Sequence, residues 1–186
     1  MSGPRIPSWV RAARTGWRWS GQQRPPFAIE PGPGEESVWD YPRPPRLVED
    51  RRHVVVQAGA LVVADTRAAL RVLETASPPT WYLPPGDVRR EWLEPCPGSS
   101  PCEWKGLASY WTLRHRDTVL ERVAWSYADP FPEFAALRDH FGFYPGRLAC
   151  FVDGERVTPQ PGGFYAGWVT REIVGPCKGE PGSEGW

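Results

Sequence analysis

The sequence predicts a mostly-β domain with one or two short helices. Residues 107–114 and 119–127 are rich in aromatic and β-branched residues and flank a short turn, as the two strands of a hairpin do. A second pair of apolar runs, at residues 53–57 and 61–64, has the same pattern. The chain lacks the alternation of strands and helices that a parallel sheet requires, which argues against a doubly wound fold.

The length of the chain, 186 residues, fits one domain whose two ends are poor core material. Residues 1–46 are predicted to be a Pro/Gly/Arg-rich arm and linker, and residues 175–186 a Gly/Pro-rich tail. The body at residues 47–174 is long enough to bury about two-thirds of its unfolded surface. It therefore needs neither a metal nor a disulfide to fold.

The predicted elements follow one another along this body. Residues 53–57 and 61–64 form a hairpin, and Asp65-Thr66 caps a short helix at residues 67–75, where Leu70, Leu73 and Glu74 have helical spacing. Further strands are expected at residues 37–41, 80–83, 147–152, 156–158 and 167–174.

Proline and capping residues predict the remaining elements. Asp87 is a good N-cap for a helical turn that ends at Leu93, and residues 94–103 form a Pro/Gly/Ser/Cys loop. Residues 132–140 are predicted to be a second helix. Asp153-Gly154 is a dipeptide typical of hairpin turns.

The charge of the chain is balanced, with 22 basic and 22 acidic residues and a pI near 6.8. Such a chain has no overall field that would attract nucleic acid or an anionic membrane. The exception is the first 29 residues, which contain no acidic residue and these arginines: Arg5, Arg11, Arg14, Arg18 and Arg24. No apolar run approaches the ~18 residues of a membrane span or forms a secretory signal, so a cytoplasmic location is expected.

The cysteines predict no metal site. Cys96, Cys102, Cys150 and Cys177 lack the two-residue spacing of a zinc knuckle, and the three histidines of the chain stand apart from them. A disulfide framework is not expected in the cytoplasm, although a transient Cys96–Cys102 redox pair remains an alternative. The sequence predicts no cofactor.

The chain uses arginine in place of lysine almost everywhere. Twenty of its 22 basic residues are arginines, and only Lys105 and Lys178 are lysines. This bias suggests a GC-rich genome, in which a lysine is retained where an amine is specifically needed.

Seven short motifs occur in the order found in one bacterial family: Val63-Ala64-Asp65-Thr66, residues 71–75, Pro79-Thr80-Trp81-Tyr82-Leu83-Pro84, Asp87-Val88, Cys102-Glu103-Trp104-Lys105-Gly106, Ala124-Trp125-Ser126-Tyr127 and Phe143-Tyr144-Pro145. Over about residues 51–160 the chain resembles the domain-of-unknown-function family 427, sometimes labelled nucleotidyltransferase-like. The segment from Pro31 to Pro45 and the tail ending in Gly185-Trp186 resemble extended actinobacterial members.

The resemblance implies a β-tent, in which two antiparallel sheets meet at an angle and enclose a pocket. This shape is similar to the cereblon ligand-binding domain, which has an aromatic cage and a structural zinc. The chain lacks the paired Cys-x-x-Cys ligands, so the zinc is not expected here. Nucleotide transfer is disfavoured as well, because neither paired carboxylates on a strand nor a phosphate-binding Gly-x-x-x-x-Gly-Lys-Ser/Thr loop is present.

Two residues are the candidates for chemistry. A cation lowers the pKa of a nearby thiol, so Lys105, three residues after Cys102, could make it a nucleophile. The alternative is that Cys102 fills core space and Lys105 is a surface or ion-paired residue. The candidate ligand-binding residues, most of them aromatic, are Arg71, Tyr82, Lys105, Tyr110, Trp125 and Tyr127.

These candidates have structural alternatives too. The aromatic residues could be ordinary core, and Tyr82 or its neighbour Trp81 must face away from any pocket, because neighbours on a strand point in opposite directions. Arg71 could form a local ion pair with Glu74.

Three functions are therefore considered. The first is binding of a small planar or anionic ligand in an aromatic pocket. The second is an enzyme that uses Cys102 or Lys105 covalently. The third is an interaction module whose residues 11–19 bind RNA or a partner protein.

Overall fold

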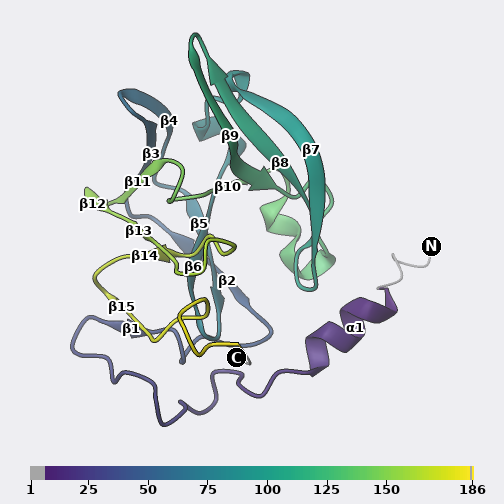
Figure 1. The fold of residues 1–186 in the computed structure, drawn as a ribbon, viewed down its shortest axis with the longest axis vertical. Helices are drawn as coiled ribbons and strands as arrows, with labels where there is room; N and C mark the ends of the chain where they lie inside the picture. Colours follow the sequence, from purple (N-terminus) through teal and green to yellow (C-terminus); the bar gives the residue numbers. More distant parts are fainter. Residues whose placement is uncertain (1–6, 185) are drawn as a thin grey trace.

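In the computed structural model, which describes residues 7–184 and 186, the chain is 44% strand and 11% helix, so the prediction of a mostly-β fold is confirmed (Figure 1). Arg5 of the basic arm and Gly185 of the tail lie outside the described residues. No helix among the described residues is long and apolar enough to cross a membrane.

The largest element is a seven-stranded sheet in which every pair of neighbours is antiparallel. Its strands, in spatial order, are β2 (Arg46–Asp50), β5 (Ala69–Glu74), β6 (Ser77–Leu83), β10 (Phe141–Phe143), β9 (Thr118–Ser126), β8 (Gly106–His115) and β7 (Leu93–Cys102). The long strands β7, β8 and β9 extend to one end of the molecule (Figure 1). The predicted hairpin at residues 107–127 is confirmed as β8 and β9.

A four-stranded antiparallel sheet packs against the larger sheet. Its spatial order is β12 (Glu155–Arg156), β11 (Ala149–Val152), β3 (Val54–Ala58) and β4 (Leu61–Thr66). Two further pairs are short: β1 (Glu36–Ser37) is parallel to β15 (Ile173–Val174), and β13 (Thr158–Pro159) is antiparallel to β14 (Trp168–Val169). The helical elements are α1 (Ser8–Thr15) and three 3-10 turns, η1 (Pro85–Asp87), η2 (Arg90–Trp92) and η3 (Pro132–Leu137).

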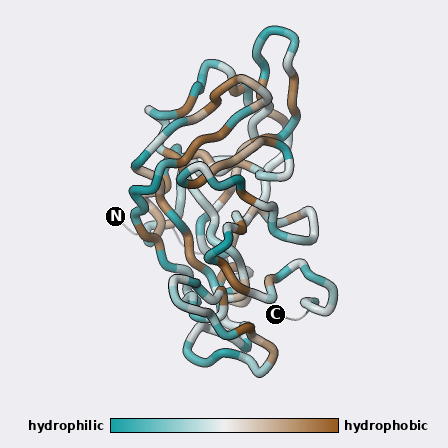
Figure 2. The backbone as a smooth tube through the Cα atoms, turned by 90° about the vertical axis from the view of Figure 1, so that its left-hand side faces the viewer, coloured by the Kyte–Doolittle hydropathy of each residue, from teal (hydrophilic) through white to brown (hydrophobic). Residues whose placement is uncertain are grey.

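The main core lies between the two larger sheets. Apolar residues of β3 and β4 pack there against those of β6, β8, β9 and β10, among them Val56, Trp81, Leu83, Leu113 and Phe143. In Figure 2 hydrophobic stretches run along strands in the middle of the molecule, whereas several hairpin tips are hydrophilic. Trp81 therefore belongs to the core between the sheets, and Tyr82 faces the other side of β6.

A second apolar cluster covers that other side of the seven-stranded sheet. Tyr82, Trp125 and Tyr127 meet Phe134 and Leu137 of η3 there. Because both faces of the sheet carry buried side chains, its central strands are apolar on both sides.

The two ends of the chain pack together in a third cluster. Trp39 is fully buried, and its Nε1 donates a hydrogen bond to the carbonyl of Pro176 (3.0 Å). Phe27 stacks on Trp186 with ring centres 4.9 Å apart. The parallel pairing of β1 with β15 joins the same two segments.

The predicted helix at residues 67–75 is wrong, because this segment forms β5. The strand pairs with β2 on one side and β6 on the other, so both of its edges are hydrogen-bonded. A register shift between Val72 and Glu74 disturbs the alternation of side chains, which gave the apolar residues their helix-like spacing.

The predicted loop at residues 94–103 is also wrong, because it forms most of β7. Pro95, Pro97 and Pro101 are compatible with a strand here, since β7 is the edge of its sheet and pairs with a neighbour on one side only. A bulge between Cys96 and Ser99 accommodates Gly98.

Three smaller predictions need correction. The first 34 residues, expected to hold no element, contain α1, in which Val10 is buried. The helices expected at residues 87–93 and 132–140 are only short 3-10 turns, because proline and the adjoining strands leave no room for a longer helix. The single strand expected at residues 167–174 is two, β14 and β15, which join different sheets.

Candidate functional site

A cavity of about 480 Å³ lies on the face of the seven-stranded sheet that points away from the core between the sheets. Strands β5, β6, β8 and β9 supply its floor, and the turn between β7 and β8 supplies one wall. The cavity is completed by Trp17 from the N-terminal part of the chain and by residues 160–167 and Lys178 from the C-terminal part. The resemblance implied a pocket between the two sheets, but that space is filled by the apolar core.

The floor of the cavity is aromatic. Trp125 lies edge-on to Tyr82 with ring centres 5.8 Å apart, and its Nε1 donates a hydrogen bond to the Tyr82 hydroxyl (3.2 Å). Tyr144 packs on the other side of Trp125 at 4.7 Å. Tyr127 and Tyr110 continue the surface, and the Tyr110 hydroxyl is 2.6 Å from the Ser100 hydroxyl.

Burial raises the pKa of the Tyr82 and Tyr127 hydroxyls, so both are neutral at physiological pH. A neutral phenol can donate as well as accept a hydrogen bond. The floor therefore offers flat apolar rings with a few polar atoms, which suits a planar ligand.

Lys105 lies in the turn between β7 and β8 and is only 8% exposed. Burial acts to lower the pKa of Lys105, whereas the electronegative atoms of Tyr82 and Cys102 and the carboxylates of Glu74 and Glu103 act to raise it, and the pKa lies above the ordinary lysine value. The amine is therefore a cation at neutral pH. Lys105 takes part in none of the ion pairs formed by the described residues, so this buried cation has no direct counter-ion.

Gly106 supports the turn rather than the ligand. A glycine at this position allows a ligand or another part of the backbone to approach closely, and here it does not line the cavity. Its φ is +107°, and a Cβ there would lie 3.2 Å from the carbonyl oxygen of Asp129. The glycine is needed for its positive φ and for the close contact with the backbone of the Asp129 segment.

Cys102 also lines the cavity, at the end of β7 and opposite Gly106. The structure thus brings together both candidates for chemistry and four of the candidate binding residues, namely Tyr82, Tyr110, Trp125 and Tyr127. No histidine lines the cavity among the described residues, so a Cys–His pair is not formed there.

Arg71 is the predicted binding residue that lies elsewhere, because it does not line the cavity. It is the cross-strand partner of Trp81 and so lies on the core face of β5. Its guanidinium pairs with Asp50 (Nε–Oδ2 3.0 Å) and Glu36 (Nη1–Oε2 3.2 Å). The predicted local pair with Glu74 is not formed, because Glu74 pairs with Arg43 (3.4 Å).

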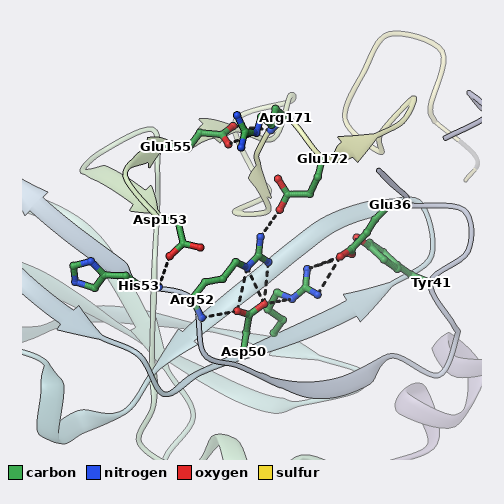
Figure 3. A network of polar contacts seen from close by, with 10 residues as sticks. Glu36, Tyr41, Asp50, Arg52, His53, Asp153, Glu155, Arg171 and Glu172 are labelled. Atoms are coloured by element: carbon green, nitrogen blue, oxygen red, sulfur yellow. Dashed lines mark hydrogen bonds and ion pairs between the residues drawn. The ribbon is translucent and has the colours of Figure 1, made fainter. Parts of the chain in front are cut away.

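The network around Arg71 connects distant parts of the chain. Arg52 pairs with Asp50 (2.9 Å) and with Glu172 (2.5 Å), as Figure 3 shows. Glu36 accepts a hydrogen bond from the Tyr41 hydroxyl (2.7 Å). These contacts join the segment before β2 and the segment after β14 to the sheet.

Lys178, the second lysine of the chain, lines the same cavity as the first. Its Nζ lies 4.6 Å from the ring centre of Trp17 and 5.7 Å from that of Tyr165. The lining contains four basic side chains, which include Arg122 and Arg147, against two acidic ones, Glu74 and Glu103. A chain without net charge therefore has a cavity whose lining is net basic.

Gln160 links two segments that line the cavity. Its Nε2 donates to the carbonyl of Lys178 (2.7 Å), and its Oε1 accepts from the N–H of Gly167 (3.1 Å). The side chain is 4% exposed. One buried amide thus fixes the loop at residues 160–167 to the segment that carries Lys178.

Sequence reasoning missed these lining residues. Trp17, Tyr144, Gln160 and residues 163–167 have no local pattern that would place them against the sheet. Lys178 had a signal, because the arginine bias that selected Lys105 applies to it equally.

The described residues contain no group of three His, Cys, Asp or Glu side chains that could hold a metal ion. Among residues 7–184 and 186, the carboxylates lining the cavity are Glu74 and Glu103. The arrangement suits binding through a cation and aromatic rings, and it does not resemble a two-metal phosphoryl-transfer site.

The basic residues near the N-terminus are partly engaged within the chain. Arg14 pairs with Glu133 (3.0 Å) and donates from Nε to the carbonyl of Glu103 (2.6 Å). Arg24 pairs with Glu30 and Asp40. Arg11 is exposed, so an interaction with RNA or a partner through this segment stays a prediction.

Comparison with known families identifies the central part of the chain. The family model described as a domain of unknown function (DUF427), which carries the label NTP_transf_9, matches residues 46–157. The resemblance inferred from the motifs is thereby confirmed. No curated protein matches the chain. The cavity floor lies within the matched range, whereas Trp17, Gln160 and Lys178 lie outside it.

Proposed function

Because the chain belongs to the DUF427 family, whose description assigns no activity, we propose from the cavity itself that the protein binds a small, planar, anionic ligand. The observation that carries this proposal is Lys105, a buried cation at an aromatic cavity that forms no ion pair with the residues described by the structure. Burying an ammonium group is costly unless a partner compensates for the lost water. A bound carboxylate or phosphate is such a partner.

The aromatic floor of the cavity supports the proposal that the ligand is planar. Trp125, Tyr82 and Tyr144 present rings that a flat ligand can stack on or meet edge-on. The volume of about 480 Å³ falls within the usual range for small-molecule sites. The excess of basic over acidic lining residues favours an anion over a cation.

Titration of tryptophan fluorescence with benzoate tests the proposal, with benzamide as the uncharged match. We expect benzoate to bind the full chain and benzamide to bind much more weakly. In Lys105→Met the loss of a charged hydrogen bond, about 1.5–3 kcal/mol, should weaken benzoate binding roughly tenfold or more. Native mass spectrometry of the purified protein would reveal a ligand retained from the cell.

Arg67→Met provides the matched control, because it removes one positive charge from an exposed position outside the cavity. This control should bind benzoate as the wild type does. Lys105→Met should not lower the melting temperature of the ligand-free protein, since it removes an unpaired buried cation. A large loss of stability with benzoate affinity intact would show that Lys105 is structural.

A further inference from the structure

We propose that the amine of Lys178 condenses with a carbonyl group of the ligand, so that the cavity takes an aldehyde or ketone which also carries a carboxylate or phosphate. This inference rests on the proposed function for the anionic part of the ligand. The carbonyl group of the ligand is inferred from the position and surroundings of Lys178 alone.

The backbone of Lys178 is fixed from both sides. Its N–H donates to the carbonyl of Ala76 (2.7 Å), and its carbonyl accepts from the buried amide of Gln160 (2.7 Å). The side chain lines the cavity between the rings of Trp17 and Tyr165. The amine therefore occupies a defined place against the space where a ligand would bind.

The surroundings of Lys178 favour the neutral amine. The guanidinium carbon of Arg43 lies 3.9 Å from the centre of the same Trp17 ring that Lys178 approaches. Burial lowers the pKa of Lys178, and the charge of Arg43 lowers it further, while Glu74 and Glu103 oppose the shift. Lys178 is absent from the ion pairs of the described chain. An amine that is desolvated beside another cation is the kind that forms Schiff bases.

Lys105 and Lys178 thus have opposite environments in one cavity. The pKa of Lys105 is shifted upwards and that of Lys178 downwards. Two like groups whose pKa values are separated by their surroundings can take different roles at one site. Lys105 stays charged and holds an anion, and Lys178 supplies a nucleophile.

The reaction balances without a further reactant. The lone pair of the Lys178 Nζ attacks the carbonyl carbon, and the carbonyl oxygen leaves as water with two protons, equal in number to the two that the amine nitrogen loses. The product is an imine that links the Lys178 nitrogen to the former carbonyl carbon. Added cyanoborohydride delivers a hydride to that carbon and leaves a stable secondary amine.

The test uses 4-formylbenzoate, a planar anionic aldehyde, with cyanoborohydride and the full chain at neutral pH. The chain offers only its terminal amine, Lys105 and Lys178, so intact-mass measurement and peptide mapping assign every adduct. We expect one adduct at Lys178, formed at least about tenfold faster than at Lys105, because only a neutral amine attacks a carbonyl and the pKa of Lys178 alone is lowered. Lys178→Arg should lose this adduct.

Two comparisons separate this inference from the proposed function. Benzaldehyde lacks the carboxylate and should label Lys178 more slowly, and Lys105→Met should slow labelling by 4-formylbenzoate but leave its site unchanged. Labelling confined to the terminal amine, with benzoate binding intact, would overturn this inference alone. Equal labelling of Lys178 by both aldehydes in wild type and Lys105→Met would overturn the anionic requirement, and with it the proposed function.

Discussion

The indole of Trp125 lies directly against the backbone of Gly142, in the space that a side chain on β10 would occupy. The two residues are cross-strand partners on β10 and β9, and a Cβ at Gly142 would lie 2.3 Å from the Trp125 ring. The glycine thus allows the largest ring of the cavity floor to lie flat on the sheet.

Gly142→Ala should therefore destabilise the protein and move Trp125. Overpacking of this kind costs about 1–3 kcal/mol. Chemical denaturation should show the loss of stability, and benzoate affinity should fall with it. Gly146→Ala is the matched control, because the nearest atoms to its Cβ would lie at 3.8 Å. Equal stability of the two variants would contradict the contact.

Arg71→Met should reduce stability without affecting benzoate binding. The change removes a partner of Asp50, a largely buried carboxylate, and such a loss costs about 1–3 kcal/mol. Urea unfolding measures the stability, and fluorescence titration measures the binding. If Arg71→Met weakened benzoate binding as much as Lys105→Met does, Arg71 would belong to the site after all.

Asp50 should make stability depend on pH in the acidic range. Burial acts to raise the pKa of Asp50, but hydrogen bonds and charge from Arg52, together with Arg71, outweigh it and lower the pKa. The unfolded chain then binds more protons than the folded one, so the contribution is present above the unfolded pKa of about 4 and is lost as pH falls through the folded pKa.

Unfolding free energies at pH 7 and at mildly acidic pH test this dependence. Asp50→Asn should flatten the difference between the two conditions. Asp117→Asn, at an exposed hairpin tip, should leave it as in the wild type. An unchanged slope in Asp50→Asn would mean that another carboxylate accounts for the acid sensitivity.

The cysteines should divide into two classes on treatment with iodoacetamide under native conditions. Cys150 and Cys177 are buried, and burial raises the pKa of both thiols, that of Cys177 to about 12. Only Cys96 and Cys102, which are partly exposed, should react. Benzoate should protect Cys102, which lines the cavity, but not Cys96, as mass spectrometry of peptides would show. Protection of neither would place the ligand elsewhere.

The class of fold and much of the cavity floor are predictable from the order of the amino acids. Side chains two residues apart on a strand point to the same face, so Trp125 and Tyr127 can be assigned to one face without knowledge of the fold. The arginine bias likewise singled out Lys105, because composition is visible in one chain. Strand alternation is a local pattern and arginine bias is a property of the whole composition, so both can be recognised in the sequence alone.

The surroundings of these residues depend instead on contacts that form when the whole chain packs. The strand β5 exists because β2 and β6 pair with its two edges, and local spacing had favoured a helix instead. The cavity faces away from the core between the sheets because Trp81, rather than Tyr82, fills that core. Lys178 reaches Lys105's cavity through contacts with Ala76 and Gln160, which lie far from it along the chain. Contacts between distant segments depend on the packing of the whole chain, and no local pattern records them.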